Sequence, residues 1–257
     1  ALNFANRSII PVSTNASPGA KKYSYYSYDK KGIAELRSDY SKDSPKINVK
    51  GKESIVDIYP IRASMDYDDS DLKADATANR NLIGQKKVEL IGSFQRRLDI
   101  VVANGQADVN LFGIVNHPNV IEYTIPAGAS GFTTWATKTA DEILNDLLAL
   151  ISGMIAASKG VHEINTFILP VAQYGIILGK KLGTDTTNTI LGFMQDTYPE
   201  IKFAKSTRLQ GASEAKTDMI IGCEASPDNF VIEIPQDYEE FPIFNKGPLY
   251  EQDAHIR

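Results

Sequence analysis

The sequence predicts a mixed α+β fold for this chain of 257 residues. A strongly apolar helix is predicted over residues 139–159, and it leads directly into a short apolar strand over 166–170. A second, longer helix is predicted over 70–103, and short apolar strands follow in the last quarter of the chain. Helices and strands in this irregular order are typical of an α+β domain with ample core.

The composition excludes several broad classes. The chain is 42% hydrophobic and 23% charged and carries a net charge of −5, so it lacks the basic excess of a tight nucleic-acid binder. One cysteine, Cys223, permits no internal disulfide and fits a reducing compartment. No run of 18 apolar residues and no signal-peptide pattern is present, so we expect a soluble chain.

The first 65 residues read as extended segments with few buried positions. Residues 1–20 mix Asn, Ser, Pro and Gly without periodicity, which indicates an arm that is ordered only if something else holds it. A tyrosine-rich strand over 23–28 and a turn over 29–32 follow. The charged stretch 32–51 is either a solvated loop or a projecting hairpin that packs on a neighbouring copy. Pro60 indicates that the next extended run, 53–65, lies at a sheet edge.

Four aspartates precede the long helix. These residues, Asp66, Asp68, Asp69 and Asp71, resemble a calcium-binding loop. That pattern needs Gly at its sixth position and Glu at its twelfth, where this chain has Asp71 and Thr77. Acids at a helix start capped by Ser70 explain them better. The helix over 70–103 has one narrow apolar stripe and would span ~50 Å if unbroken. Gly84 or Gly92 is a candidate kink.

The central helix has the clearest local signals. Before it come a Gly- and Pro-marked loop over 109–119, a predicted strand over 120–125, a turn, and Trp135 as an anchor for the start of the helix. Thr139 and Glu142 have the spacing of a capping box, and Gly160 suits the C-terminal cap. Apolar residues cover most of the helix circumference, so we expect it to be buried inside a domain.

The last third is predicted as short elements. Helices are expected over 171–182 and 186–197, and strands over 201–209, 217–223 and 230–234. Residues 235–257 are acidic, aromatic and proline-rich. No internal repeat is visible.

No stretch of the sequence has the complete residue pattern of a known motif for catalysis, metal binding or cofactor binding. Gly175 to Lys180 lacks the spacing of a phosphate-binding loop, and Thr166 stands where a zinc-protease motif starting at His162 needs its second histidine. The three histidines lack metal-ligand spacing, and no nucleophile elbow is present. A Cys223–histidine pair and a carboxylate pair stay open as alternatives, but no residue singles them out.

Several strings, in the same order along the chain, closely resemble one family of tailed-phage major capsid proteins. They are Tyr26-Ser-Tyr-Asp-Lys-Lys-Gly32, Val49-Lys-Gly-Lys52, Gly113-Ile-Val-Asn-His-Pro118, the Trp135 turn with the capped helix, Gly160-Val-His-Glu163, Asn165-Thr-Phe-Ile-Leu-Pro170, Ile232-Glu-Ile-Pro-Gln-Asp-Tyr-Glu-Glu-Phe241 and Asp253-Ala-His255. The resemblance spans nearly the whole chain.

The resemblance implies the Hong Kong 97-like fold that phage shells share with encapsulins. In its terms, residues 1–28 are an N-terminal arm and 29–56 an extended E-loop. Residues 57–163 form a P-domain, with the capped helix as its spine and residues 232–257 returning to it. Residues 164–231 form an A-domain. Relatives continue past the His255 region into another strand, whereas this sequence stops at Arg257.

The implied function is that of a major capsid protein of a tailed double-stranded DNA phage. It would self-assemble into hexamers and pentamers of an icosahedral shell in the host bacterial cytoplasm, with portal, scaffold and decoration proteins as partners and only weak contact with DNA. No enzyme activity, cofactor, metal or membrane partner is expected. The residues expected at subunit interfaces are Lys31, Arg37, Lys46, Lys50, Ile114, Asn116, His117 and Pro118. The alternatives are an encapsulin-like compartment and, from another class, a soluble hydrolase.

Overall fold

The computed structural model describes residues 9–31, 48–78, 81–183, 187–213, 215–247 and 249–257, and only the backbone of 28–31 and 48–50. The helices are α1 (Asp69–Ala78), α2 (Leu82–Asn104), α3 (Ala140–Ala157), α4 (Val171–Gly179) and α5 (Ile190–Thr197), with 3-10 turns η1 (Ala107–Val109) and η2 (Thr207–Leu209). The strands are β1 (Val12–Ser13), β2 (Lys22–Lys31), β3 (Asn48–Asp57), β4 (Ile61–Asp68), β5 (Thr166–Pro170), β6 (Lys202–Ser206), β7 (Ile221–Cys223), β8 (Ile232–Glu233), β9 (Glu239–Glu240), β10 (Phe244–Lys246) and β11 (Leu249–Ile256).

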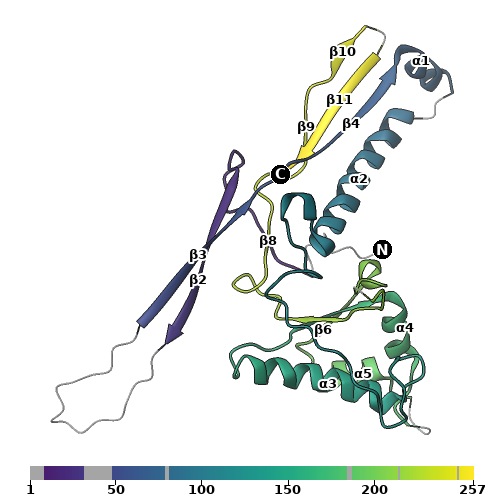
Figure 1. Cartoon of the computed structure of the whole chain (residues 1–257). Coiled ribbons are helices and arrows are strands. Elements are labelled where there is room, and N and C mark those ends of the chain that lie inside the picture. The colour runs from purple at the N-terminus through teal and green to yellow at the C-terminus, as the bar shows by residue number, and fades with distance from the viewer. Residues whose placement is uncertain (1–8, 32–47, 79–80, 184–186, 214, 248) are drawn as a thin grey trace.

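Figure 1 shows two packed bodies and one projecting hairpin. The first body combines α1 and α2 with the sheet β10-β11-β4, to which β9 adds at β11. The second body combines α3, α4 and α5 with the mixed sheet β6-β5-β7. The hairpin of β2 and β3, called the ribbon below, extends away from both bodies.

The first body is built on one face of its sheet. Alternation along β4 buries Met65 and Tyr67, and these side chains belong to one cluster with Leu90 and Phe94 of α2. Tyr67 also stacks on Tyr250 of β11, with ring centroids 5.4 Å apart. Strand β4 lies at the end of the sheet order, which confirms the edge position that was predicted for this segment.

The second body is organised around β5, all five residues of which are buried. Phe167 and Leu169 join the large cluster formed with α3, α4 and α5, whereas Ile168 joins a smaller cluster with Ile10 and Leu209. A parallel neighbour (β6) and an antiparallel one (β7) pair with it. The predicted buried strand over 166–170 is confirmed.

Helix α3 begins as predicted but is less buried than expected. The capping box is complete: Thr139 Oγ1 accepts from the Glu142 amide at 3.3 Å, and the Glu142 carboxylate accepts from the Thr139 amide at 2.8 Å. Only Ile143, Asp146 and Leu147 are buried, so the expectation of a helix enclosed on all sides is wrong for the single chain. One face packs on the second body, and the opposite side lies at the border of the molecule.

The amino-terminal segment corrects another expectation. Residues 9–20 are held by their own chain rather than by a neighbour. Ile10 is fully buried, β1 pairs in parallel with β8, and the Ala16 amide donates to Glu233 at 2.7 Å. The idea of an arm without support within the subunit is therefore wrong for this segment, while residues 1–8 lie outside the described part of the chain.

The long helix predicted over 70–103 is two helices. Asn81, just before α2, has a left-handed backbone (φ 51°), which asparagine tolerates better than most residues and which ends a helical run. Both carboxylate oxygens of Asp75 accept from the Leu82 amide, at 2.8 and 2.9 Å, and so cap the second helix. Neither Gly84 nor Gly92 breaks the helix.

Three predicted strands shorten, one divides into two, one lengthens to Lys31 and so takes up the described part of the turn predicted over 29–32, and one is wrong. Residues 53–65 divide into β3 and β4 around Pro60; 201–209 becomes β6 followed by η2; and 217–223 and 230–234 reduce to β7 and β8. Residues 120–125 form no strand: they alternate in sequence but pair with no neighbour, and Ile121 and Tyr123 are exposed. Conversely, 235–257, where no element was predicted, supplies β9, β10 and β11.

Candidate assembly surfaces

Most of the described side chains of the ribbon are exposed. Ten residue pairs join β2 and β3, from Lys22 opposite Asp57 to Lys31 opposite Asn48, and span about 30 Å. Tyr26 is 56% exposed and Ile55 is 61% exposed, and the register places both on one face. A two-stranded hairpin is only marginally stable by itself, so an apolar face of this kind needs a covering surface.

The predicted interface lysines and arginine of this region are only partly placed. The backbone of Lys31 lies opposite Asn48, and that of Lys50 lies opposite Asp29, both toward the far end of the ribbon. Arg37 and Lys46 lie outside the described residues.

The second predicted interface segment, residues 114–118, folds against the end of α2. The Ile114 and Val115 amides donate to the carbonyls of Val102 and Ala103 at 2.9 and 3.0 Å, so they satisfy acceptors that a helix end leaves free. The segment approaches so closely that a Cβ on Gly113 would lie 2.4 Å from the Ala103 oxygen. Glycine is therefore required at this position.

Within this loop the predicted residues divide into inner and outer positions. Ile114 is buried in its own subunit, so its side chain supports the loop from within. Asn116 donates to the Asn104 carbonyl at 3.0 Å and accepts from the Gly113 amide at 2.7 Å. His117 meets the exposed ring of Phe112 edge-on, and Pro118 is exposed. The outward-facing part of the loop is thus Phe112, His117 and Pro118.

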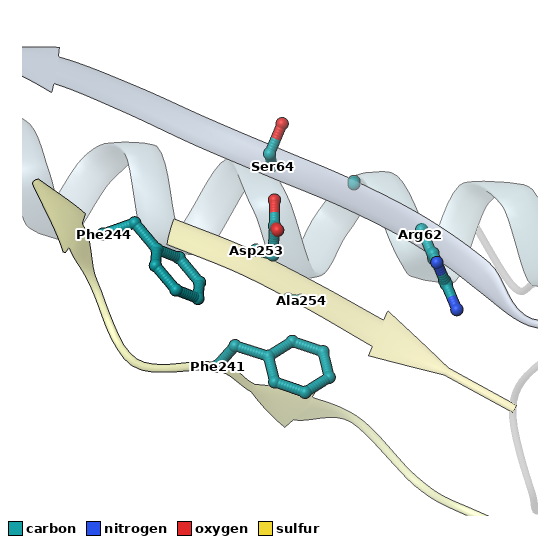
Figure 2. Close-up of a pocket in the computed structure, with 7 residues that line it drawn as sticks. Arg62, Ser64, Phe241, Phe244, Asp253 and Ala254 are labelled. Atoms are coloured by element: carbon teal, nitrogen blue, oxygen red, sulfur yellow. The ribbon is translucent and has the colours of Figure 1, made fainter. Parts of the chain in front are cut away.

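A third surface, which the sequence did not reveal, lies on the face of the first body's sheet opposite α2. A cavity of about 440 Å³ opens there, as Figure 2 shows, and we call this surface the outer sheet face. The cavity is lined by Arg62, Ala63, Ser64, Phe241, Phe244, Asp253 and Ala254.

The outer sheet face combines exposed apolar groups with acidic ones. Phe244 is 54% exposed, and Ile243 beside it is 51% exposed. Asp66 and Asp253 add two carboxylates and Arg62 one cation, and Lys246 of β10 forms an ion pair with Glu251 of β11. Such a surface favours a partner that covers the apolar groups and carries charged groups able to pair with its carboxylates and its cations.

The segment before α3 forms a fourth surface, held from beneath by a buried ionic cluster. The Lys138 ammonium, fully buried, donates to both Asp146 oxygens at 2.9 and 2.7 Å and to the Pro126 carbonyl at 2.8 Å. The Trp135 indole donates to Asp146 Oδ2 at 2.9 Å. The predicted anchoring role of Trp135 is confirmed. The same segment also contains Ile121, which is 78% exposed.

The cysteine and the histidines that could serve catalysis or metal binding do not form a site. Burial raises the pKa of the Cys223 thiol to about 11, which leaves it protonated and a poor nucleophile near neutral pH. His162 Nδ1 contacts Glu224 at 2.8 Å, and His255 Nε2 contacts Gln236 at 3.2 Å. In the part of the chain that the structure describes, no three His, Cys, Asp or Glu side chains gather in a way that could hold a metal ion. Among these residues no helix is long and apolar enough to cross a membrane.

The fold is that of phage capsid subunits. The capsid of Myoviridae phage XM1 superposes with a TM-score of 0.81 at 17% identity, covering 100% of this chain and 86% of that one. Mycobacterium phage Ogopogo matches with a TM-score of 0.59 at 12% identity, covering 97% and 85%. A virus-like particle from Pyrococcus furiosus matches with a TM-score of 0.56 at 11% identity, covering 100% and 87%. The Hong Kong 97-like α+β fold is thereby confirmed.

Sequence comparison supplies the family. Residues 32–253 match the profile of the family described as major capsid protein. No curated protein matches the chain. The chain belongs to the major capsid protein family, whose members are subunits of viral shells.

Proposed function

We propose that the chain is the subunit of an icosahedral shell that encloses the double-stranded DNA of a tailed phage. In this proposal copies associate into hexamers and pentamers in the host bacterial cytoplasm, and portal, scaffold and decoration proteins join the particle. The single observation that carries it is the ribbon, which extends away from both bodies and exposes Tyr26 and Ile55. Obligate assemblies bury roughly 2,000–5,000 Å² per interface, and a projecting hairpin supplies such area.

The covering surface that fits the ribbon best is the outer sheet face of another copy. The far end of the ribbon has Lys30, Lys31, Lys50 and Lys52 in its sequence against one acid, Asp29. The outer sheet face offers the carboxylates of Asp66 and Asp253 together with exposed phenylalanine. Complementary charge steers association and fixes register, while the aromatic and aliphatic groups supply the buried area.

The loop with Phe112, His117 and Pro118 is proposed as a second contact between subunits. The inner side of this loop already forms hydrogen bonds with the C-terminal end of α2. Its outward-facing residues are therefore the part that a neighbouring subunit can contact. The expected units are proposed as follows: an arm within 1–28, an E-loop over 29–56, a P-domain that contains the first body, and an A-domain over 164–231. Because α3 packs on β5, α4 and α5, we propose that it joins residues 164–231 in the A-domain instead of forming the spine of the P-domain, as was expected.

A charge exchange tests the docking. Lys50→Glu should reduce particle yield at least tenfold, and adding Asp253→Lys in the same chain should restore most of it, since the proposed docking then has both charges reversed. Lys202→Glu, at an exposed position of β6, is the matched control and should assemble normally. Particles are counted by electron microscopy after size-exclusion chromatography. A double variant no better than Lys50→Glu would contradict this docking.

The encapsulin-like compartment is separated from the phage shell by particle contents. A phage shell expressed with its packaging partners holds nuclease-protected double-stranded DNA, whereas a compartment holds a protein cargo. An unassembled chain with a ligand-dependent melting shift would instead favour the hydrolase alternative.

A further inference from the structure

The two bodies meet at a small junction. Ala103 of α2 contributes to the same buried cluster as Ile168 of β5 and Leu209 of η2. Ile10 of the amino-terminal segment is fully buried there as well. This cluster has fewer buried members than the one within the second body, so a single polar contact beside it can influence the angle between the bodies.

One ion pair spans this junction at its rim. Asp99, on α2, is 1% exposed, and the Arg208 Nε of η2 donates to its Oδ2 at 3.0 Å. Arg208 is positioned by its neighbours: its amide donates to Ser206 Oγ at 3.1 Å, and the adjacent Leu209 is fully buried. The arginine side chain itself is 36% exposed, whereas the Asp99 carboxylate that it contacts is buried.

We propose that the Asp99–Arg208 pair sets the angle between the two bodies and thereby the diameter of the shell, an inference that rests on the proposed function. A buried carboxylate strongly favours keeping its cation close, which makes the pair a directional restraint between α2 and η2. Helix α2 is about 35 Å long, so a rotation of about 5° at the junction would move its far end by roughly 3 Å. In a closed shell of repeated contacts, such a change alters curvature.

The experiment compares Arg208→Gln with Arg96→Gln in the full chain. Arg96 is on the same helix as Asp99 and pairs with exposed Glu89 within the first body, so its loss should leave the junction intact. The angle is measured by electron–electron double resonance between spin labels at Val88→Cys and Leu178→Cys, both exposed, in a Cys223→Ser background. The diameter is measured by electron microscopy of assembled particles.

Arg208→Gln should at least double the width of the distance distribution and broaden the range of particle diameters, while Arg96→Gln changes neither. Unchanged distances in Arg208→Gln would overturn the proposal, and so would broadened distances with an unchanged diameter. If Arg208→Gln does not fold, Asp99→Asn, which removes the carboxylate charge of the pair, replaces it with the same readouts. Failure of the unsubstituted chain to assemble would refute the proposed function, whereas the distance measurement on the unassembled subunit would still test the restraint.

Discussion

Glu142 links the start of α3 to the turn that precedes it. Its carboxylate accepts from the Ser130 amide at 2.7 Å and from the Thr139 amide at 2.8 Å. These two backbone donors, Ser130 first, lower the pKa of Glu142 to about 2. Because the pKa is lower in the folded state, the stabilisation is complete above the ordinary value of 4.5 and is lost as pH falls toward 2.

The prediction concerns Glu142→Gln. The unsubstituted chain should melt at a higher temperature than this variant at pH 6, and the difference should shrink steadily as the pH is lowered from about 5 to about 2. Thermal unfolding followed by circular dichroism across this range checks it. A difference that does not depend on pH would show that the charge of Glu142 contributes nothing.

Lys138 contributes to the stability of the fold through its buried ion pair with Asp146. Lys138→Met leaves the buried Asp146 carboxylate without its cation and should destabilise the chain by about 3–5 kcal/mol in urea unfolding. The double variant Lys138→Met/Asp146→Leu removes both charges and should regain at least half of that loss. Lys202→Met, at an exposed site, should stay within about 0.5 kcal/mol of the original chain. A double variant as unstable as the single one would contradict this account.

Gly113 offers a matched test of backbone approach. Gly113→Ala would bring a Cβ to 2.4 Å from backbone atoms of Ala103 and Gly105, and we expect a loss of about 1–3 kcal/mol in chemical denaturation. Gly153, within α3, has open space where a Cβ would be added, with no atom within 4 Å, so Gly153→Ala should stabilise the chain by up to about 1 kcal/mol. Equal effects of the two substitutions would refute the close approach.

At the scale of elements, the sequence predicts correctly those features that depend on interactions between residues close together in the chain. The Thr139–Glu142 capping box and the apolar strand over 166–170 are both present, because each depends on a few neighbouring residues. The predicted strand over 120–125 failed because alternation alone does not supply a pairing partner. The break before α2 depends on Asn81 adopting a left-handed backbone, which no periodicity indicates.

The candidate surfaces show the same division. The charged segment and the Gly113 to Pro118 string stand out in the sequence, and they lead to the ribbon and to the loop against α2. The outer sheet face could not be predicted, since it is formed only when β4, β10 and β11 come together from distant parts of the chain. The attachment of residues 9–20 was missed for the same reason: β1 finds its partner β8 more than 200 residues later.

That attachment changes how the amino terminus should be studied. Removing residues 1–28 deletes buried Ile10, β1 and most of β2, so such a truncation would damage the subunit as well as its assembly. A point substitution on the ribbon is the cleaner experiment.

Ile55→Asp is that substitution. Ile55 is 61% exposed on the ribbon, so the variant subunit should fold with an unchanged melting temperature but fail to form particles. Val161→Asp, at a site 72% exposed beside α3, is the control and should still assemble. Circular dichroism and size-exclusion chromatography separate the two effects. Normal particles from Ile55→Asp would show that the ribbon face stays uncovered in the assembly.

At the scale of the whole molecule, the chain buries two cores and still leaves large apolar groups outside them. Exposed apolar side chains are found on the ribbon, on the outer sheet face and in the segment around Ile121. Their exposure to water does not stabilise an isolated subunit. Family membership and the fold shared with the phage XM1 capsid suggest the role of these surfaces: we propose that they are the parts that other copies complete.

The most direct test of this account is electron microscopy of the purified full chain, after size-exclusion chromatography at micromolar concentration. The account predicts closed megadalton particles of regular diameter, in which density for the β2–β3 hairpin crosses onto a neighbouring subunit. A population that stays monomeric, or closed particles in which each hairpin contacts only its own subunit, would contradict it.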